Sequence, residues 1–131
     1  LVCIVALFAS SCQQSNVDTG DFECEFDNES NTAAIIGYNG NEEDVDVPQA
    51  FGKYTVTSIE RNAFAEKYDI SRVTIPETVT TICQWAFYNC ENLAAVHFSE
   101  GLQKMENLVF IWCQALTTLH NDSSLLRRRI L

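Results

Sequence analysis

Apolar residues in this chain recur at a fixed step of 23 residues. Phe64, Phe87 and Phe110 keep this step, and aliphatic columns run in phase with them. These columns are Val56, Val79 and Leu102; Ile59, Ile82 and Met105; Ala63, Ala86 and Val109; Ile70, Leu93 and Leu116; and Val73, Val96 and Leu119. A period of roughly 20–30 residues indicates one supersecondary unit stacked along an axis. The sequence therefore predicts a solenoid.

One part of each coil has the two-residue alternation of a strand. Val73 and Ile75 flank Thr74, which predicts two inward side chains and one outward side chain. Pro76 ends this strand, because it has no N–H to donate to a continued ladder. Residues 44–48 have the same form, so we expect them to begin a first coil with a longer connection.

The rest of each coil is expected to hold two shorter elements. Val79 and Ile82 mark a second extended piece, and residues 85–88 have the spacing of one helical turn. Phe87 is expected to point inward, and Leu93 closes the coil. The predicted class is an α/β solenoid with short parallel strands and one helical turn per 23-residue coil.

The phenylalanine column is the expected source of cohesion. When coils stack in register, Phe64, Phe87 and Phe110 meet one above another. Each ring buries about 150–250 Å². We therefore predict a continuous aromatic row through the array.

A hairpin is predicted ahead of the repeats. Apolar and acidic residues alternate over 22–26, turn-forming residues occupy 27–31, and a second extended run follows over 32–38. A solenoid needs its first coil covered. We expect residues 22–43 to form that capping hairpin and residues 44–120 to form the array.

The repeat pattern breaks down after residue 120. Arg128 falls in the column of Met105, and Asn121 falls in the column of Phe98. A charged residue in a buried column disrupts stacking, so residues 121–131 are expected to be a degenerate coil or tail. They form either a polar cap or the site of a truncation.

The first residues are expected to be a targeting segment. Residues 1–9 form an apolar run too short to span a bilayer, and Ser10, Ser11 and Cys12 follow. Residues 1–12 resemble a bacterial lipoprotein signal, in which Cys12 would be lipidated. The alternative is a buried first strand. Residues 13–21 are polar and acidic and would form a tether.

The repeats resemble a known family. The segments VTSIERNAF (56–64), IPETVTTICQWAFYNCENLAAVHF (75–98) and GLQKMENLVFIWCQAL (101–116) are similar to the BspA-type leucine-rich repeat of bacterial surface proteins. That repeat combines a strand, a Val-x-x-Ile step, an Ala-Phe-x-x-Cys turn and a closing leucine. The resemblance covers about residues 22–120.

The resemblance carries functional expectations. It implies a leucine-rich-repeat solenoid that is exported, non-enzymatic and often involved in attachment to host or neighbouring-cell proteins. Cys83 and Glu106 stand where the family usually has glycine, and Lys67 stands where it has cysteine. These departures concern the geometry of turns.

Composition and charge narrow the class of partner. Apolar residues make up 47% and charged residues 20% of the chain, as in a folded soluble protein. The chain has eighteen acidic and eight basic residues, and its net charge is −10. Such a surface repels phosphate backbones, so we expect no nucleic acid partner. A membrane would be contacted only through the lipid anchor.

The outward strand positions are the predicted partner-binding face. They form rows of fixed pitch, which suits a protein ligand, and they comprise Arg72, Thr74, Ala95, His97, Thr118 and His120. Two imidazoles on adjacent strands would lie about 5 Å apart, within reach of one metal ion. No third ligand shares their column, so we expect an ordinary exposed face and no cofactor.

The cysteines raise two further questions. Cys90 and Cys113 are one repeat apart and are either buried free thiols or a disulfide. A Cys–His nucleophile pair would need the turns and the strands to meet, although they occupy different sides of a coil. The chain also has no phosphate-binding loop or His-Glu-x-x-His segment. We expect no enzyme.

Two functions fit these observations. The first is an exported binding module, anchored at the bacterial cell surface, that mediates protein–protein interaction or adhesion. The second is a structural spacer, or a truncated fragment of a longer array, with the binding function elsewhere.

Overall fold

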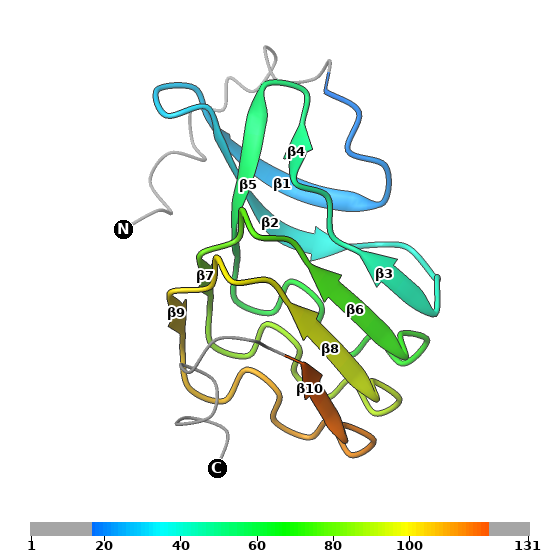
Figure 1. The fold of residues 1–131 in the computed structure, drawn as a ribbon. Coiled ribbons are helices and arrows are strands. Elements are labelled where there is room, and N and C mark those ends of the chain that lie inside the picture. The colour runs from blue at the N-terminus through cyan, green and yellow to red at the C-terminus, as the bar shows by residue number, and fades with distance from the viewer. Residues whose placement is uncertain (1–16, 121–131) are drawn as a thin grey trace.

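The computed structural model describes residues 17–120, which form ten strands (Figure 1). The predicted signal segment with Cys12, most of the tether and residues 121–131 lie outside the described residues. The strands are β1 (Phe22–Asp27), β2 (Thr32–Tyr38), β3 (Asp44–Asp46), β4 (Ala50–Phe51), β5 (Tyr54–Ile59), β6 (Arg72–Ile75), β7 (Thr81–Ile82), β8 (Ala95–Phe98), β9 (Lys104–Met105) and β10 (Thr118–His120).

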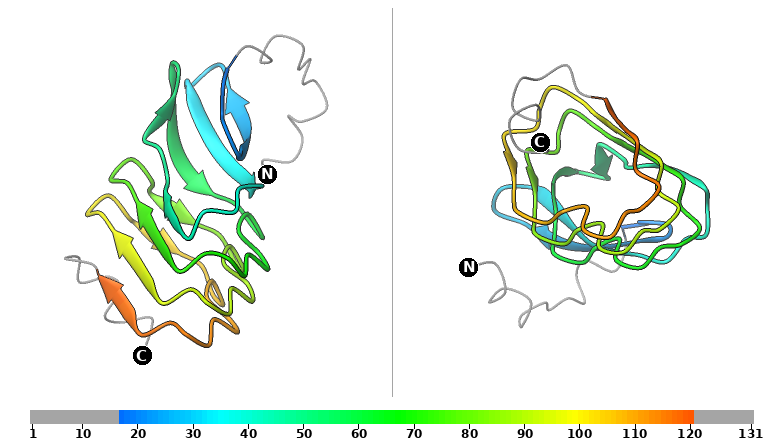
Figure 2. Two further views of the ribbon diagram at one scale, coloured as in Figure 1. Left: turned by 90° about the vertical axis from the view of Figure 1, so that its right-hand side faces the viewer. Right: turned by 90° about the horizontal axis from the view of Figure 1, so that it is seen from below.

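Two sheets run along the stack. One is four-stranded and wholly parallel, in the order β10-β8-β6-β3. The other has six strands in the order β1-β2-β5-β7-β9, with β4 beside β5. Seen along the axis, the coils outline a three-sided cross-section, and turns form the third side (Figure 2). The predicted solenoid is therefore confirmed.

The register of the parallel strands follows the 23-residue step. Val73 pairs with Val96, and Val96 pairs with Leu119. β3 extends this sheet by one strand, because Val45 pairs with Val73. β3 therefore lies where the strand of a first coil is expected. β6 alternates exposed and buried residues as predicted, and it ends at Ile75, immediately before Pro76.

The expected N-terminal hairpin is present. β1 and β2 pair antiparallel from Phe22↔Tyr38 to Asp27↔Thr32. Asp27 holds the turn, because its carboxylate accepts bonds from the Glu29 amide at 2.8 Å and the Ser30 hydroxyl at 2.8 Å. β2 then pairs parallel with β5, so the hairpin covers the edge of the first coil.

The predicted helical turn is wrong. The described residues contain no helix, and hence none that could cross a membrane. Trp85 and Asn89 adopt left-handed φ values of 63° and 55°, which interrupt a right-handed helix. Alternate amides of this region bond the next coil instead: Phe87 N–H donates to Val109 O at 3.0 Å, and Asn89 N–H donates to Ile111 O at 2.9 Å. Hydrogen bonds between stacked coils thus use backbone N–H groups that a helix would use for its own bonds.

The aromatic row is confirmed and forms the centre of the core. Phe64 and Phe87 are fully buried, and their rings stack at 4.9 Å with an interplanar angle of 9°. Phe87 and Phe110 stack at 5.5 Å and 20°. Tyr38 of the hairpin packs on Phe64 at 5.4 Å. The same row therefore joins the cap to the repeats.

The cysteines of the described residues are free thiols. Cys90 is buried, and its thiol donates to the Phe64 carbonyl at 2.9 Å. Cys113, one coil later, donates to the Phe87 carbonyl at 3.0 Å. Equivalent cysteines thus make equivalent bonds to the preceding coil and add to the cohesion between coils.

The aromatic row makes a prediction about stability. Phe87→Ala removes a buried ring that stacks on both sides, and we expect a loss of about 3–5 kcal/mol in the free energy of unfolding. Phe110→Ala removes a ring at the less buried end of the row and should cost less. Urea unfolding followed by circular dichroism measures both. Equal losses for the two variants would contradict the central place given to Phe87.

Burial also makes a prediction about thiol reactivity. Burial raises the pKa of Cys24 from its ordinary 9.0 to about 12. Burial, together with the nearby carboxylates of Glu60 and Glu106, raises the pKa of Cys83 to about 12 as well. The thiolate is the reactive form, so at pH 8 its population is about a thousandfold smaller than for an ordinary thiol.

We expect iodoacetamide to modify Cys24 and Cys83 slowly in the native protein and rapidly in urea. Peptide mass spectrometry separates these sites from Cys3 and Cys12. Native rates that match those in urea would contradict the burial of these thiols.

Candidate binding surface

The four-stranded sheet brings the predicted partner-binding residues together. Thr74 pairs with His97, and His97 pairs with His120, which gives one row across β6, β8 and β10. Arg72, Ala95 and Thr118 form a second row beside it. The alternating residues Val73 and Val96 are fully buried beneath. We call the six outward residues the sheet face. That they contact a partner remains a prediction.

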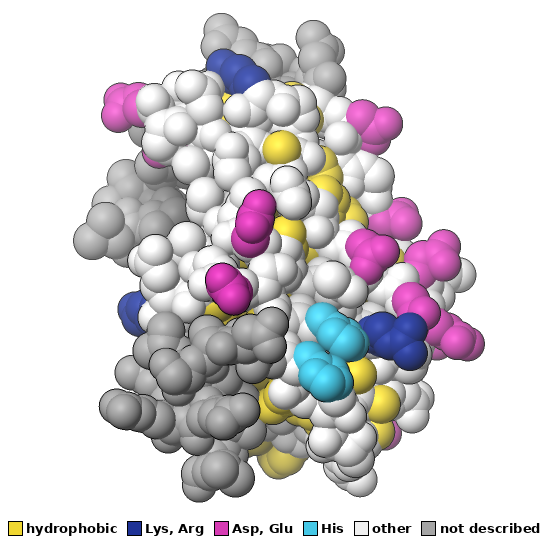
Figure 3. All heavy atoms as spheres, viewed as in Figure 1, with side chains coloured by type: hydrophobic (Ala, Val, Ile, Leu, Met, Phe, Trp, Pro, Cys, Tyr) yellow, Lys and Arg dark blue, Asp and Glu magenta, His cyan; other side chains and the backbone are white. Residues whose placement is uncertain are grey.

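The two histidines of the sheet face, His97 and His120, contact each other. Their rings stack with centroids 5.0 Å apart and planes 14° from parallel, and Figure 3 shows them side by side (cyan). The separation agrees with the spacing expected from adjacent strands. Among residues 17–120, no three His, Cys, Asp or Glu side chains converge. The described chain thus offers a metal ion at most these two imidazoles at this point.

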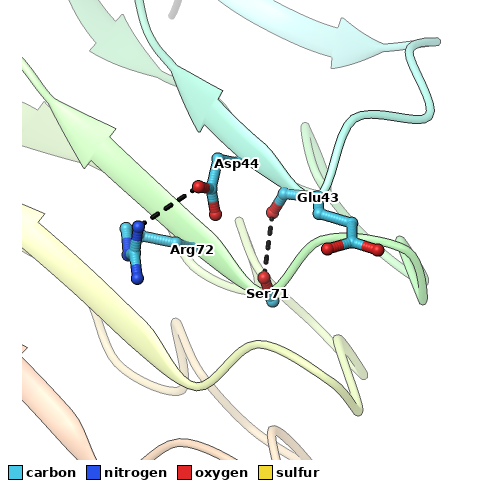
Figure 4. A network of polar contacts seen from close by, with 4 residues as sticks. All are labelled: Glu43, Asp44, Ser71 and Arg72. Atoms are coloured by element: carbon cyan, nitrogen blue, oxygen red, sulfur yellow. Dashed lines mark hydrogen bonds and ion pairs between the residues drawn. The ribbon is translucent and has the colours of Figure 1, made fainter.

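An ion pair occupies one edge of the sheet face (Figure 4). Arg72 Nη1 lies 3.2 Å from Asp44 Oδ2 on β3. Next to it, the Ser71 hydroxyl donates to the Glu43 carbonyl at 3.3 Å. Both charged side chains are more than half exposed. Asp44 offsets the charge of Arg72, and Glu42, Glu43 and Asp46 leave the edge towards the hairpin acidic overall.

An open pocket of about 440 Å³ lies beyond this edge. Its walls come from residues 18–22, from Tyr38 and from residues 42–51, and they include Asp18, Asp21, Glu42, Asp44 and Asp46. Sequence reasoning missed it, because no local pattern brings the tether beside β3 and β4. The sequence signals it through charge alone, since residues 13–57 hold ten acidic residues and one basic residue.

A second group of residues missed by sequence reasoning lies on the turn side. Tyr68, Trp85, Tyr88 and Trp112 come from three successive coils. Tyr88 lies 6.5 Å from Trp85 and 5.2 Å from Trp112, measured between ring centroids. The expectation of a helical turn hid this group. Its signal was the presence of large aromatics outside the buried columns.

The stacked parallel coils and the exposed rows that they align define a class of protein. It is a leucine-rich-repeat solenoid, a class of generally non-enzymatic binding scaffolds. The model of the BspA type leucine rich repeat region (6 copies) matches residues 51–128. The chain belongs to this family.

Solved structures share the fold. A leucine rich cell surface protein from Faecalibacterium prausnitzii is 31% identical with a TM-score of 0.66, over 77% of this chain and 29% of that protein. The leucine-rich repeat protein of T. pallidum is 24% identical with a TM-score of 0.75, over 79% and 49%. One from Bacteroides capillosus is 24% identical with a TM-score of 0.60, over 80% and 98%.

The chain matches only part of the length of the first two structures. The chain spans 29% of the F. prausnitzii protein and 49% of the T. pallidum protein. No curated protein matches the chain. The family model therefore establishes the family, the solved structures establish the fold, and the particular partner is left to be argued from this molecule.

The exposed ion pair makes a prediction about the sheet face. Arg72→Ala should lower the free energy of unfolding by less than about 1 kcal/mol, because exposed pairs are screened by water and salt. The effect should shrink further in high salt. Urea unfolding at two ionic strengths measures this. A large loss that persists in high salt would show that Arg72 supports the fold, and sheet-face variants would then be poor probes of binding.

Proposed function

We propose that this protein is a non-enzymatic, exported leucine-rich-repeat module that mediates protein–protein interaction or adhesion at a bacterial cell surface. The family supports a binding scaffold, and the 31% identical F. prausnitzii structure is that of a leucine rich cell surface protein. The ligand would be an extracellular host protein or a neighbouring-cell protein.

The sheet face is the observation that carries this proposal. Its side chains stand in register on strands spaced about 4.8 Å apart, over a core of buried valines. Such a surface is already ordered before a partner arrives, so binding orders few groups of this chain. Its outward residues also have little part in packing, which leaves them free to suit a ligand.

The route to the surface is part of the same proposal. Residues 1–12 would direct export, Cys12 would carry lipid, and residues 13–21 would space the repeats from the membrane. Two acyl chains hold a protein on a bilayer far better than one. Membrane contact would then come through the anchor alone. The net charge of −10 also supports a partner other than nucleic acid.

One observation favours a second candidate function. The chain spans 29% of the F. prausnitzii protein and 49% of the T. pallidum protein. A structural spacer, or a fragment of a longer array with its binding site elsewhere, would account for that length. Binding by the present chain on its own separates the two functions.

The test is a binding screen of the full chain against immobilised extracellular proteins. We expect at least one specific ligand, and Thr74→Arg should weaken its binding by about tenfold or more, since the substitution places a bulky charge on the sheet face. Thr55→Arg, the same change at an exposed position of β5, is the matched control and should leave affinity unchanged.

Phe87→Ala, assayed at a urea concentration that unfolds it and leaves the wild type folded, serves as the unfolded control. A signal that survives in this variant would indicate non-specific adsorption. Equal effects of the two arginine substitutions would remove the sheet face from the proposal. A failure of the full chain to bind any ligand would favour the spacer.

A further inference from the structure

The turn side carries a continuous aromatic surface. We call Tyr68, Trp85, Tyr88 and Trp112 the turn face. Trp112 is 58% exposed and Tyr68 is 45% exposed. The ring contacts of Tyr88 join Trp85 to Trp112. Tyr68 is linked to the group through Asn89, the residue after Tyr88, whose Nδ2 donates a hydrogen bond to the Tyr68 hydroxyl at 3.2 Å.

The backbone shows that the fold does not require tryptophan there. Trp85 and Trp112 have φ values of 63° and 64°, in the left-handed region. The residue equivalent to Trp85 in the preceding coil is Asn62. The residues equivalent to Trp112 in the two preceding coils are Asn89 and Glu66. Asparagine adopts this conformation readily, whereas bulky residues are strained in it. Trp112 therefore costs stability while most of its ring stays in water.

Two carboxylates lie beside the turn face at Tyr68, whereas the cations of that coil are Lys67 and Arg61, the latter on Trp85. The pKa of the Tyr68 hydroxyl is raised by loss of hydration and by the charges of Glu66 and Glu91, which places both carboxylates near this ring. Both glutamates are exposed. An aromatic surface edged by carboxylates complements a cation, since the ring faces and the carboxylates both attract positive charge.

One ring of the turn face already holds a cation. The guanidinium of Arg61 lies 4.2 Å from the centroid of Trp85. This contact shows that the site accepts an arginine stacked on an indole in the folded protein. Tyr88 and Trp112 continue the same surface into the next coil, and the analogous cation there would have to come from another molecule.

We propose that the turn face binds an extended segment of a partner protein rich in arginine or lysine. A guanidinium or ammonium group would lie over the rings of Tyr88 and Trp112, and a second would pair with Glu66 or Glu91. The turns and the four-stranded sheet occupy different sides of the coil (Figure 2). This surface is therefore independent of the sheet face proposed above.

The probe is a fluorescent peptide in which arginine and glycine alternate, titrated with the full chain and followed by anisotropy. We expect Trp112→Asn to weaken binding about three- to tenfold, as for loss of a cation–π contact. The substitution leaves the net charge unchanged and suits the left-handed backbone. Its free energy of unfolding should be equal to or above that of the wild type.

Thr55→Asn, a charge-neutral change at an exposed position of β5 outside both surfaces, is the matched control and should leave the affinity unchanged. Glu91→Gln should weaken binding and reduce its salt dependence. A second aromatic variant, Tyr88→Leu, should act in the same direction as Trp112→Asn.

Three results would overturn the proposal. Unchanged affinity in both aromatic variants, with a loss in Glu91→Gln, would reduce the interaction to general attraction between the acidic protein and a cation. Tighter binding of a glycine–proline peptide or of a neutral oligosaccharide, dependent on Trp112, would show that the ligand is uncharged. Unfolding of Trp112→Asn at lower urea than the wild type would show that Trp112 serves the fold.

Discussion

Hydrogen bonds between neighbouring coils run on all three sides of this solenoid, and the rest of the structure depends on them. On the two sheets, Cys83 N–H donates to Ile59 O at 2.9 Å and Ala94 N–H donates to Ser71 O at 2.8 Å. On the turn side, Phe87 N–H donates to Val109 O at 3.0 Å. A coil that slipped by one residue would lose bonds on every side and would also misalign the stacked phenylalanines.

The same register that builds the core also builds the surfaces. Stacking every 23 residues places like columns together whether they point inward or outward. Inward columns are restricted to apolar residues by packing, and left-handed columns favour asparagine or glycine. The outward columns of the sheet face are free of both restrictions. Trp85 and Trp112 occupy left-handed positions without the preferred residue, as do Glu66 and Leu108 in the same two columns.

Stability in such an array comes from each coil and its nearest neighbours, so the ends matter most. At the N-terminal end, β2 pairs with β5, and the rings of Phe22 and Tyr38 pack on Phe64. The cap thus uses both interactions that join the repeats, the ladder and the aromatic row. Towards residue 120 the columns are only partly buried, as Phe110 and Leu116 show. Burial is therefore deepest in the middle coils, which contribute residues to both proposed surfaces.

The sequence by itself determined the period, the strands at Val73 and Ile75, the row of phenylalanines and the spacing of the two histidines. These features follow from like residues recurring at one step, and stacking converts that step directly into contacts. Only the tertiary structure decided the conformation of residues 85–88. Their apolar spacing suits a helical turn and a tight irregular turn equally, and bonds to the next coil select the second. The acidic pocket and the turn face likewise arise from segments that only the folded chain brings together.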